Sequence, residues 1–233
     1  MKFAIIAAGE GSRLASEGVK SPKPLIKIQG VPIIERLVKI FERAGASSIS
    51  IIINSRQPDT EKLLHNMHCS CPINIVIKDT PSSMHSMHAL IPHLRGEEKF
   101  CLTTVDTLFR KEDFMLYIEK LATSNDDGVM AVTPFIDDEK PLYVNTDSEL
   151  RITAFCDTHT DGCQYISGGI YGLTPKALDT LERCIERGES RMRNFQRALI
   201  ADGLTLHAYP IDKIIDIDHA GDIEKAEKFL AQE

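Results

Sequence analysis

Four short apolar runs recur in the first half of the chain, and a segment with helical spacing separates each run from the next. The runs are rich in β-branched residues and do not alternate with polar residues, which is typical of strands buried on both faces of a parallel sheet. The expected strands are Lys2–Ala8, Ser48–Asn54, Ile73–Lys78 and Lys99–Val105. Strands that alternate with helices predict an α/β fold with a three-layer, mostly parallel, Rossmann-like sheet.

The segments between these strands carry helix signals. Pro32 suits the first turn of a helix, apolar residues repeat every three to four positions after it, and Gly45 marks its end. The expected helices are Pro32–Ala44, Thr60–Asn66 and Ser83–His93.

The second half of the chain is less regular and predicts a mixed sheet. Two apolar runs, Leu142–Asn145 and Leu150–Phe155, are separated by four polar residues and are typical of a hairpin. Further strands are expected at Gly128–Pro134, Gln164–Leu173 and Thr205–Pro210, and helices at Pro175–Glu186, at Arg191–Asp202 and up to Ala231. Because no repeat, low-complexity tract or Pro/Gly-rich linker interrupts the chain, residues 1–233 are expected to form a single domain.

Composition narrows the classes of partner and compartment. The formal net charge of −7 disfavours a nucleic-acid partner, because a phosphate backbone requires a basic face. No run approaches the roughly 18 apolar residues of a membrane span, so no membrane partner is expected. The N-terminal apolar run is shorter than the roughly 7–15 residues of a signal peptide's core and fits a buried strand better. The six dispersed cysteines suggest reduced thiols in the cytoplasm. Nothing here indicates an oligomeric state.

A glycine-rich turn follows the first expected strand, with the sequence Gly9-Glu10-Gly11-Ser12-Arg13. Ligands in open parallel sheets bind at the carboxyl ends of strands, where glycines let backbone N–H groups approach a phosphate. A dinucleotide fingerprint is the first alternative, but Leu14 stands where its third small residue should be and Asn54 where an acidic residue is expected. An ordinary glycine turn with a solvated arginine is the second alternative.

A lysine between two prolines continues this loop. Pro22 and Pro24 each fix φ and bias the preceding residue toward an extended backbone, so Lys23 is held by a stiff segment. Such rigidity suits a charge that must point at a phosphate, although a surface lysine in a turn would have the same sequence.

With these residues the chain resembles the sugar-1-phosphate nucleotidyltransferases, a family of nucleoside triphosphate transferases. The family pattern runs A-A-G-x-G-T-R-L, a spacer, P-K-x-L and G-x-P; here Ser12 replaces the threonine, and the spacer 15–20 lacks the Pro-Leu-Thr often present. Three later segments also resemble the family: 100–106 its strand ending in Gly-Asp, 165–171 its Gly-Ile-Tyr strand, and 215–223 its D-I-D-T-P-E-D-L segment.

The resemblance implies the nucleotide-diphospho-sugar transferase fold and transfer of a nucleoside monophosphate from a triphosphate to a phosphorylated small molecule, a sugar 1-phosphate, with release of pyrophosphate. It assigns Arg13 to the β- and γ-phosphates and Lys23 to the α-phosphate and the acceptor phosphate. Mg²⁺ would be held by Asp106 and Asp218, with Asp216 as the alternative. The residues implied for nucleotide binding are Ala8, Gly9, Glu10, Gly11, Ser12, Ser82 and Ser83, and Gly169 is implied for the acceptor.

Several residues leave alternatives open. Asp106, Asp218, Ser82 and Ser83 could each cap a helix instead. Val105 replaces the glycine that usually precedes the metal aspartate, and the family's acceptor Glu-Lys is absent from 155–158. The acceptor could therefore be an alcohol phosphate such as phosphocholine, served by a cytidylyltransferase, and a non-catalytic nucleotide or sugar-nucleotide sensor is a further possibility.

For two further clusters of side chains, a structural role on the protein surface is preferred to a functional one. The zinc-ligand types His65, His68, Cys69 and Cys71 are spaced too tightly for a usual zinc site and fit a polar surface loop. Three arginines near helical spacing fit a solvated face, but they could also approach an acceptor anion. They are Arg191, Arg193 and Arg197.

Overall fold

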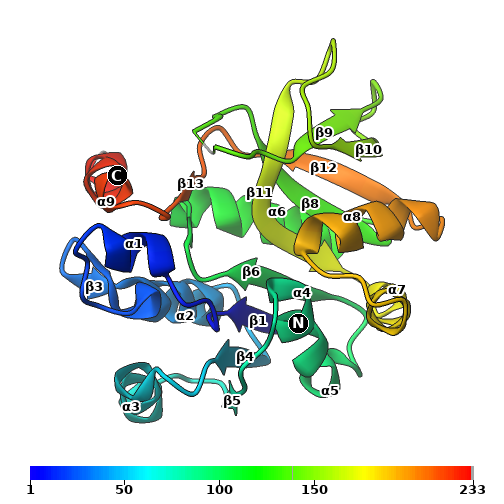
Figure 1. Ribbon diagram of the computed structural model, residues 1–233. Coiled ribbons are helices and arrows are strands. Elements are labelled where there is room, and N and C mark those ends of the chain that lie inside the picture. Colours follow the sequence, from blue (N-terminus) through cyan, green and yellow to red (C-terminus); the bar gives the residue numbers. More distant parts are fainter. Residues whose placement is uncertain (138, 232–233) are drawn as a thin grey trace.

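The computed structural model describes residues 1–137 and 139–231, and a nine-stranded sheet forms its centre (Figure 1). Four strands of the first half are parallel neighbours in the order β6-β1-β4-β5. Their bounds are β1 Lys2–Ile6, β4 Ser48–Ile53, β5 Ile73–Ile77 and β6 Phe100–Thr104. Because all four run the same way, their carboxyl ends meet at one edge of the sheet.

The second half extends the sheet with mixed directions. The long strand β11 pairs antiparallel with β6, β8 and β9, and so joins the parallel half to the rest. The hairpin β9–β10 flanks it on one side, while β12 runs parallel to β8 on the other. The bounds are β8 Gly128–Thr133, β9 Tyr143–Thr146, β10 Ile152–Cys156, β11 Tyr165–Leu173 and β12 Leu206–Pro210.

Two small ladders lie outside the main sheet. One joins β2 to β3 within the N-terminal region, and the other joins β7, just after β6, to β13 near the end of the chain. The second ladder places segments about a hundred residues apart in sequence against each other. The bounds are β2 Lys27–Ile28, β3 Val31–Pro32, β7 Thr107–Leu108 and β13 Ile215–Asp216.

Helices cover both faces of the sheet. Adjacent residues of β1 point to opposite faces, so Phe3 and Ile5 join one buried cluster while Ala4 and Ile6 join the other. The first cluster is completed by α2, α6 and α9, and the second by α4, α5, α7 and α8. The helices are α1 Ser12–Ser16, α2 Ile33–Arg43, α3 Pro58–Asn66, α4 Ser83–Ala89, α5 Ile91–Leu94, α6 Lys111–Thr123, α7 Lys176–Glu186, α8 Met192–Ala201 and α9 Ala220–Leu230, with a 3₁₀ turn η1 at Lys23–Leu25.

This arrangement confirms the predicted three-layer, mostly parallel fold with a mixed C-terminal half, and two local differences have simple causes. The single helix expected over Ser83–His93 is broken at Leu90, because Pro92 cannot donate to the preceding turn. Helix α6 was not expected, although its buried Phe114, Tyr117 and Leu121 have helical spacing. In the described part of the chain, no helix has the length and apolar character that crossing a membrane requires.

Candidate active site

The glycine loop leaves the carboxyl end of β1 and turns into α1. Gly11 is the N-cap of α1 and has φ +61°, a left-handed conformation that favours glycine. A Cβ at this position would lie 3.6 Å from the Cβ of Lys23, so the loop packs closely against that lysine. Two amides from the segment after β4 hold the loop from behind: the side chain of Asn54 donates to the Ala8 carbonyl at 3.0 Å, and that of Gln57 donates to the Gly9 carbonyl at 3.2 Å. This support was not predicted from the sequence, although a polar residue directly after a buried strand is a usable signal.

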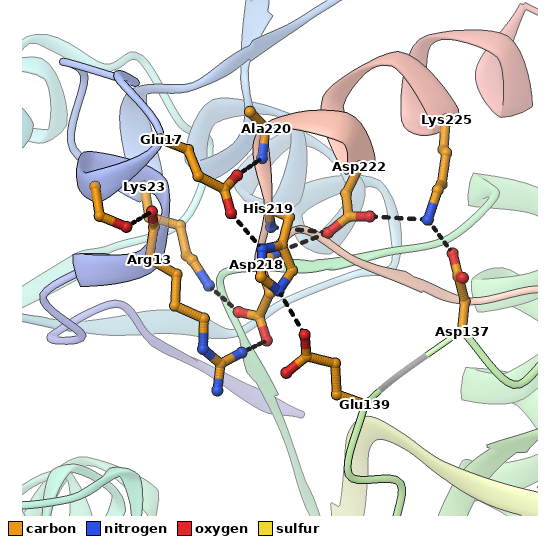
Figure 2. A network of polar contacts seen from close by, with 11 residues as sticks. Arg13, Glu17, Lys23, Asp137, Glu139, Asp218, His219, Ala220, Asp222 and Lys225 are labelled. Atoms are coloured by element: carbon orange, nitrogen blue, oxygen red, sulfur yellow. Dashed lines mark hydrogen bonds and ion pairs between the residues drawn. The ribbon is translucent and has the colours of Figure 1, made fainter.

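Lys23 is the centre of the polar cluster. Its Nζ donates to Asp106 Oδ2 at 2.8 Å and to Asp218 Oδ1 at 2.7 Å, and only 11% of its side chain is exposed. Arg13 Nη1 reaches the other oxygen of Asp218 at 2.8 Å (Figure 2). The structure therefore brings together four residues that the family resemblance implied, although up to 205 positions separate them in sequence.

Three elements position these side chains. Asp106 follows the carboxyl end of β6, Lys23 begins the rigid turn η1, and Asp218 lies between β13 and α9. The β7–β13 ladder brings the two carboxylates onto the same edge, because Thr107 pairs with Asp216 and the Ile217 N–H donates to the Asp106 carbonyl at 3.1 Å.

Mutual attraction keeps the lysine and the deeper carboxylate charged. Burial favours the neutral amine, but the neighbouring Asp106 and Asp218 outweigh it and raise the pKa of Lys23. Burial likewise favours the neutral acid at Asp106, yet the Lys23 ammonium and a hydrogen bond from Thr104 outweigh it and lower the pKa of Asp106. The cluster thus holds a fixed pattern of charge at neutral pH.

Helix capping was the alternative role for two aspartates and two serines, and the structure supports it for one serine but for neither aspartate. Asp106 precedes β7 rather than a helix, and His219 rather than Asp218 caps α9, so capping explains neither aspartate. Ser82 does cap α4, because its Oγ accepts from the His85 N–H at 3.5 Å. Ser83 is the first residue of that helix.

A cavity of about 500 Å³ opens beside the cluster, within the usual range for small-molecule sites. It is lined by the loop residues Ala8, Gly9, Glu10 and Gly11, by Ser82 and Ser83, and by Lys23, Val105 and Asp106. The loop, the serines and the charged pair thus share one cavity, as the resemblance implied. Ser12 lines a neighbouring cavity of about 310 Å³, and Arg13 lines another of about 220 Å³ together with Asp218.

Another cavity, of about 320 Å³, adjoins the 500 Å³ cavity, and both are lined by Ser83, Thr104 and Asp106. We call the 500 Å³ cavity the first cavity and this one the second cavity. Gly169 lines it with φ +72°, and a Cβ there would lie 2.5 Å from Thr107 Oγ1, so this position requires glycine. Asp216 lies on its wall, on β13.

Arg191, Arg193 and Arg197 were expected on a solvated face, but each lines a cavity or forms an ion pair. Arg191 and Arg193 line the second cavity. Arg193 also pairs with Asp157 at 2.5 Å, and Arg197 pairs with the other oxygen of Asp157 at 2.8 Å. Lys140 also lines this cavity. Its position was not predicted, because no local sequence pattern connects it to the other lining residues.

The tight His/Cys cluster lies in the last turn of α3 and in the loop after it, away from this edge. Within the described ranges no three His, Cys, Asp or Glu side chains gather as a metal site would require. His65 pairs with Glu61 along α3 at 3.6 Å, and the sulfurs of Cys69 and Cys71 lie 3.5 Å apart.

An edge that gathers a glycine-rich loop, a buried lysine and two carboxylates beside two adjoining cavities is typical of the class of proteins that bind a nucleoside triphosphate. Within that class, the family model of MobA-like NTP transferase domains matches residues 3–202, and the chain belongs to that family. The predicted nucleotidyltransferase relationship is therefore confirmed.

Individual relatives agree with the family. The bifunctional protein GlmU of Bartonella quintana is 25% identical over 241 residues, covering 96% of this chain and 51% of that protein. The D-glycero-alpha-D-manno-heptose 1-phosphate guanylyltransferase of Aneurinibacillus thermoaerophilus is 24% identical over 235 residues, covering 99% and 98% of the two chains. The solved inositol-1-phosphate CTP transferase from T. maritima superposes with a TM-score of 0.81 at 19% identity, covering 99% and 95%. The chain spans only 60%, 51% and 51% of the length of three curated relatives that it matches.

Proposed function

We propose that this chain is a nucleotidyltransferase that moves a nucleoside monophosphate from a nucleoside triphosphate onto a phosphorylated small molecule, a sugar 1-phosphate, and releases pyrophosphate. The observation that carries the proposal is the position of Lys23, whose Nζ lies within 2.8 Å of both Asp106 and Asp218. Asp106 also lines both cavities, so the charged cluster stands where a nucleotide in one would meet an acceptor in the other.

The reaction requires two groups of negative charge to approach each other. An oxygen of the acceptor phosphate attacks the α-phosphorus; a new P–O bond forms while the bond to the β-phosphate breaks, and its electron pair leaves with pyrophosphate. Positioning and charge neutralisation supply most of the catalysis in such transfers. Lys23 neutralises charge at the α-phosphate and at the attacking oxygen, and Arg13 neutralises the departing pyrophosphate.

Asp106 and Asp218 fit Mg²⁺ by their chemistry and convergence. One oxygen of each carboxylate lies 2.8 or 2.7 Å from the same ammonium nitrogen, so the two carboxylates lie close enough to each other to share a cation. Mg²⁺ binds one or two carboxylates and fills its remaining positions with water and phosphate oxygens, whose charge it then neutralises. Asp216, on the wall of the second cavity, is the alternative second ligand.

More residues support the proposed position of the nucleotide than support that of the acceptor. Backbone groups of the glycine loop suit the nucleotide's phosphates, and Ser82 and Ser83 line the region that would hold the base. Gly169 leaves room for the acceptor in the second cavity. A heptose 1-phosphate and an inositol 1-phosphate, named in two relatives, both carry one phosphate on a polyhydroxylated ring, which supports an acceptor of that class. We propose further that residues 1–233 act as one catalytic domain in the cytoplasm, in keeping with six free cysteines.

The test is pyrophosphate release from a panel of the four common nucleoside triphosphates, each with sugar 1-phosphates, inositol 1-phosphate and phosphocholine, in the presence of Mg²⁺. We expect one nucleotide to support turnover with a sugar 1-phosphate. Turnover with phosphocholine and CTP alone would replace the sugar acceptor with an alcohol phosphate. Nucleotide binding without turnover for any pair would make the chain a sensor and overturn the enzyme proposal.

Asp106→Asn gives the matched inactive control. The substitution keeps the size of the side chain but removes the charge that faces Lys23, so we expect Mg²⁺-dependent turnover to be lost, by at least about 100-fold, while the circular dichroism spectrum stays unchanged. Full activity in this variant would remove Asp106 from the site.

A further inference from the structure

A pair of hydrogen bonds joins the end of α1 to the start of α9. Glu17 caps the C-terminus of α1, four positions after Arg13. Its Oε1 accepts from His219 Nδ1 at 2.6 Å, and its Oε2 accepts from the Ala220 N–H at 2.7 Å (Figure 2). One carboxylate therefore binds two consecutive residues directly after Asp218; these contacts are the Glu17 latch.

A second carboxylate holds the same segment from the other side. Asp222 Oδ2 accepts from the backbone N–H groups of Asp218 at 3.1 Å and His219 at 2.8 Å, forming the capping box of α9. Lys225 in turn contacts Asp222 and Asp137. The backbone of Asp218 is thus fixed by α9, and the Glu17 latch fixes that helix end against the glycine loop.

The contact between Arg13 and Asp218 is too weak to set the position of Arg13 alone. The side chains of Arg13 and Asp218 are 56% and 37% exposed, and exposed ion pairs contribute little, because water competes for both charges. The latch adds a second link between the same two segments, in which one carboxylate accepts a backbone N–H and a ring N–H at short distances. Its side chains are about as exposed as that of Asp218, so the backbone N–H of Ala220 is the contact that adds most to the Arg13 pair.

The residues of the latch depart together from the family pattern. Where that pattern has Thr-Pro after its second aspartate, this chain has His219-Ala220, and Glu17 lies in the spacer that lacks Pro-Leu-Thr. A proline at position 220 would have no N–H to donate to Glu17, and a threonine at 219 would not reach as far as an imidazole. Both donors to Glu17 therefore depend on residues at which this chain differs from that pattern.

We propose that the Glu17 latch is a positioning device that holds Asp218 in register with Arg13 and Lys23. This inference rests on the proposed nucleotidyltransferase function. Glu17 and His219 are positioning residues, since they act through Asp218 and the loop that carries Arg13. Groups that orient the ligands of a catalytic site change activity when removed even though they touch no substrate.

The test is a double-mutant cycle of Glu17→Ala and His219→Ala, with kcat, acceptor KM and melting temperature measured for each variant. We expect each single variant to lower kcat by about 10-fold, within the range for such supporting groups, with little change in KM. The double variant should be slower than the slower single variant by much less than the product of the two effects, because both substitutions remove the Glu17–His219 contact. Glu17→Gln should recover part of kcat, because its amide oxygen can still accept from the Ala220 N–H.

Glu224→Ala is the control, since it removes an exposed pair with Lys228 on the same helix, 2.7 Å long, and should leave kcat unchanged. A wild-type kcat in Glu17→Ala, or effects that multiply in the double variant, would overturn the latch. A fall in melting temperature at unchanged kcat would reduce the latch to a structural contact and overturn it equally. An inactive wild type would instead overturn the proposed function, and the latch's role with it.

Discussion

At the scale of single residues, Lys23 is the side chain that connects the two carboxylates of the candidate site. It is nearly buried, it lies between two carboxylates, and the attraction of those carboxylates raises its pKa against the effect of burial. A lysine in this position stays charged at neutral pH and presents a fixed cation where phosphate charge would accumulate. Its rigid backbone, between Pro22 and Pro24, keeps that cation in place.

Lys23→Met tests this role. The variant keeps the length and much of the apolar volume of the side chain but removes its charge, so we expect kcat to fall by about 100- to 1,000-fold, as for other groups that stabilise developing charge. The measurement is pyrophosphate release at saturating substrates. Lys62→Met, at an exposed position of α3, should behave as wild type. A kcat within twofold of wild type in Lys23→Met would place the essential cation elsewhere.

The residues that touch phosphate in the proposal were accessible from sequence, whereas their supports were not. Gly11, Arg13 and Lys23 lie within one short stretch, so local spacing and stiff backbone expose them. Asn54 and Glu17 act through contacts 46 and 203 positions away, and no local pattern reports a partner at that distance. The metal assignment and the base-reading serines stay predictions.

At the scale of elements, prediction worked where one face of a helix or both faces of a strand are apolar. The parallel strands β1, β4 and β6 were found because they are buried on both faces, and α2 because its buried residues form one stripe. Short elements such as α1 and the β7–β13 ladder were missed, because two to five residues carry no periodicity and tertiary contacts alone define them.

Helix α2 also anchors the loop that follows α3, and this contact makes a prediction about pH. Glu42 accepts hydrogen bonds from Ser70 and pairs with Lys39, and these contacts lower the pKa of Glu42 to about 2. A depressed carboxyl pKa stabilises the fold above the unfolded value, 4.5, and this stabilisation is lost as pH falls toward 2. The contribution should be at most about 1 kcal/mol, because the carboxylate remains close to water.

We therefore expect Glu42→Gln to be less stable than wild type at neutral pH, and the difference in unfolding free energy to shrink as pH falls below 4.5. Urea unfolding of both proteins at about pH 7, pH 4.5 and pH 3.5 measures it. Glu98→Gln, at an exposed position before β6, is the matched control and should show no such trend. A constant difference across this range would mean that the charge of Glu42 does not stabilise the fold.

At the scale of the whole molecule, the site exists because the end of the chain returns to its beginning. The parallel half supplies the glycine loop, Lys23 and Asp106, while β11 and the segment around Asp218 come from the mixed half (Figure 1). Strand alternation predicted the first half and its active edge. The insertion of β11 between β6 and β8 depends on long-range antiparallel pairing, so local sequence patterns did not predict the second cavity, although the family resemblance named Gly169, which lines it.

The choice between two aspartates at this junction is the prediction that belongs to the whole molecule. Asp218 contacts both Arg13 and Lys23, whereas Asp216 lies on β13 with its side chain on the wall of the second cavity. If Asp218 closes the cation site, Asp218→Asn should raise the Mg²⁺ concentration for half-maximal activity by about 10- to 100-fold, and Asp216→Asn should raise it much less and act mainly on acceptor KM. Mg²⁺ titrations of turnover in both variants measure this. The reverse order would assign the second ligand to Asp216 and would mean that the bond from Lys23 to Asp218 serves only to bring the two ends of the chain together.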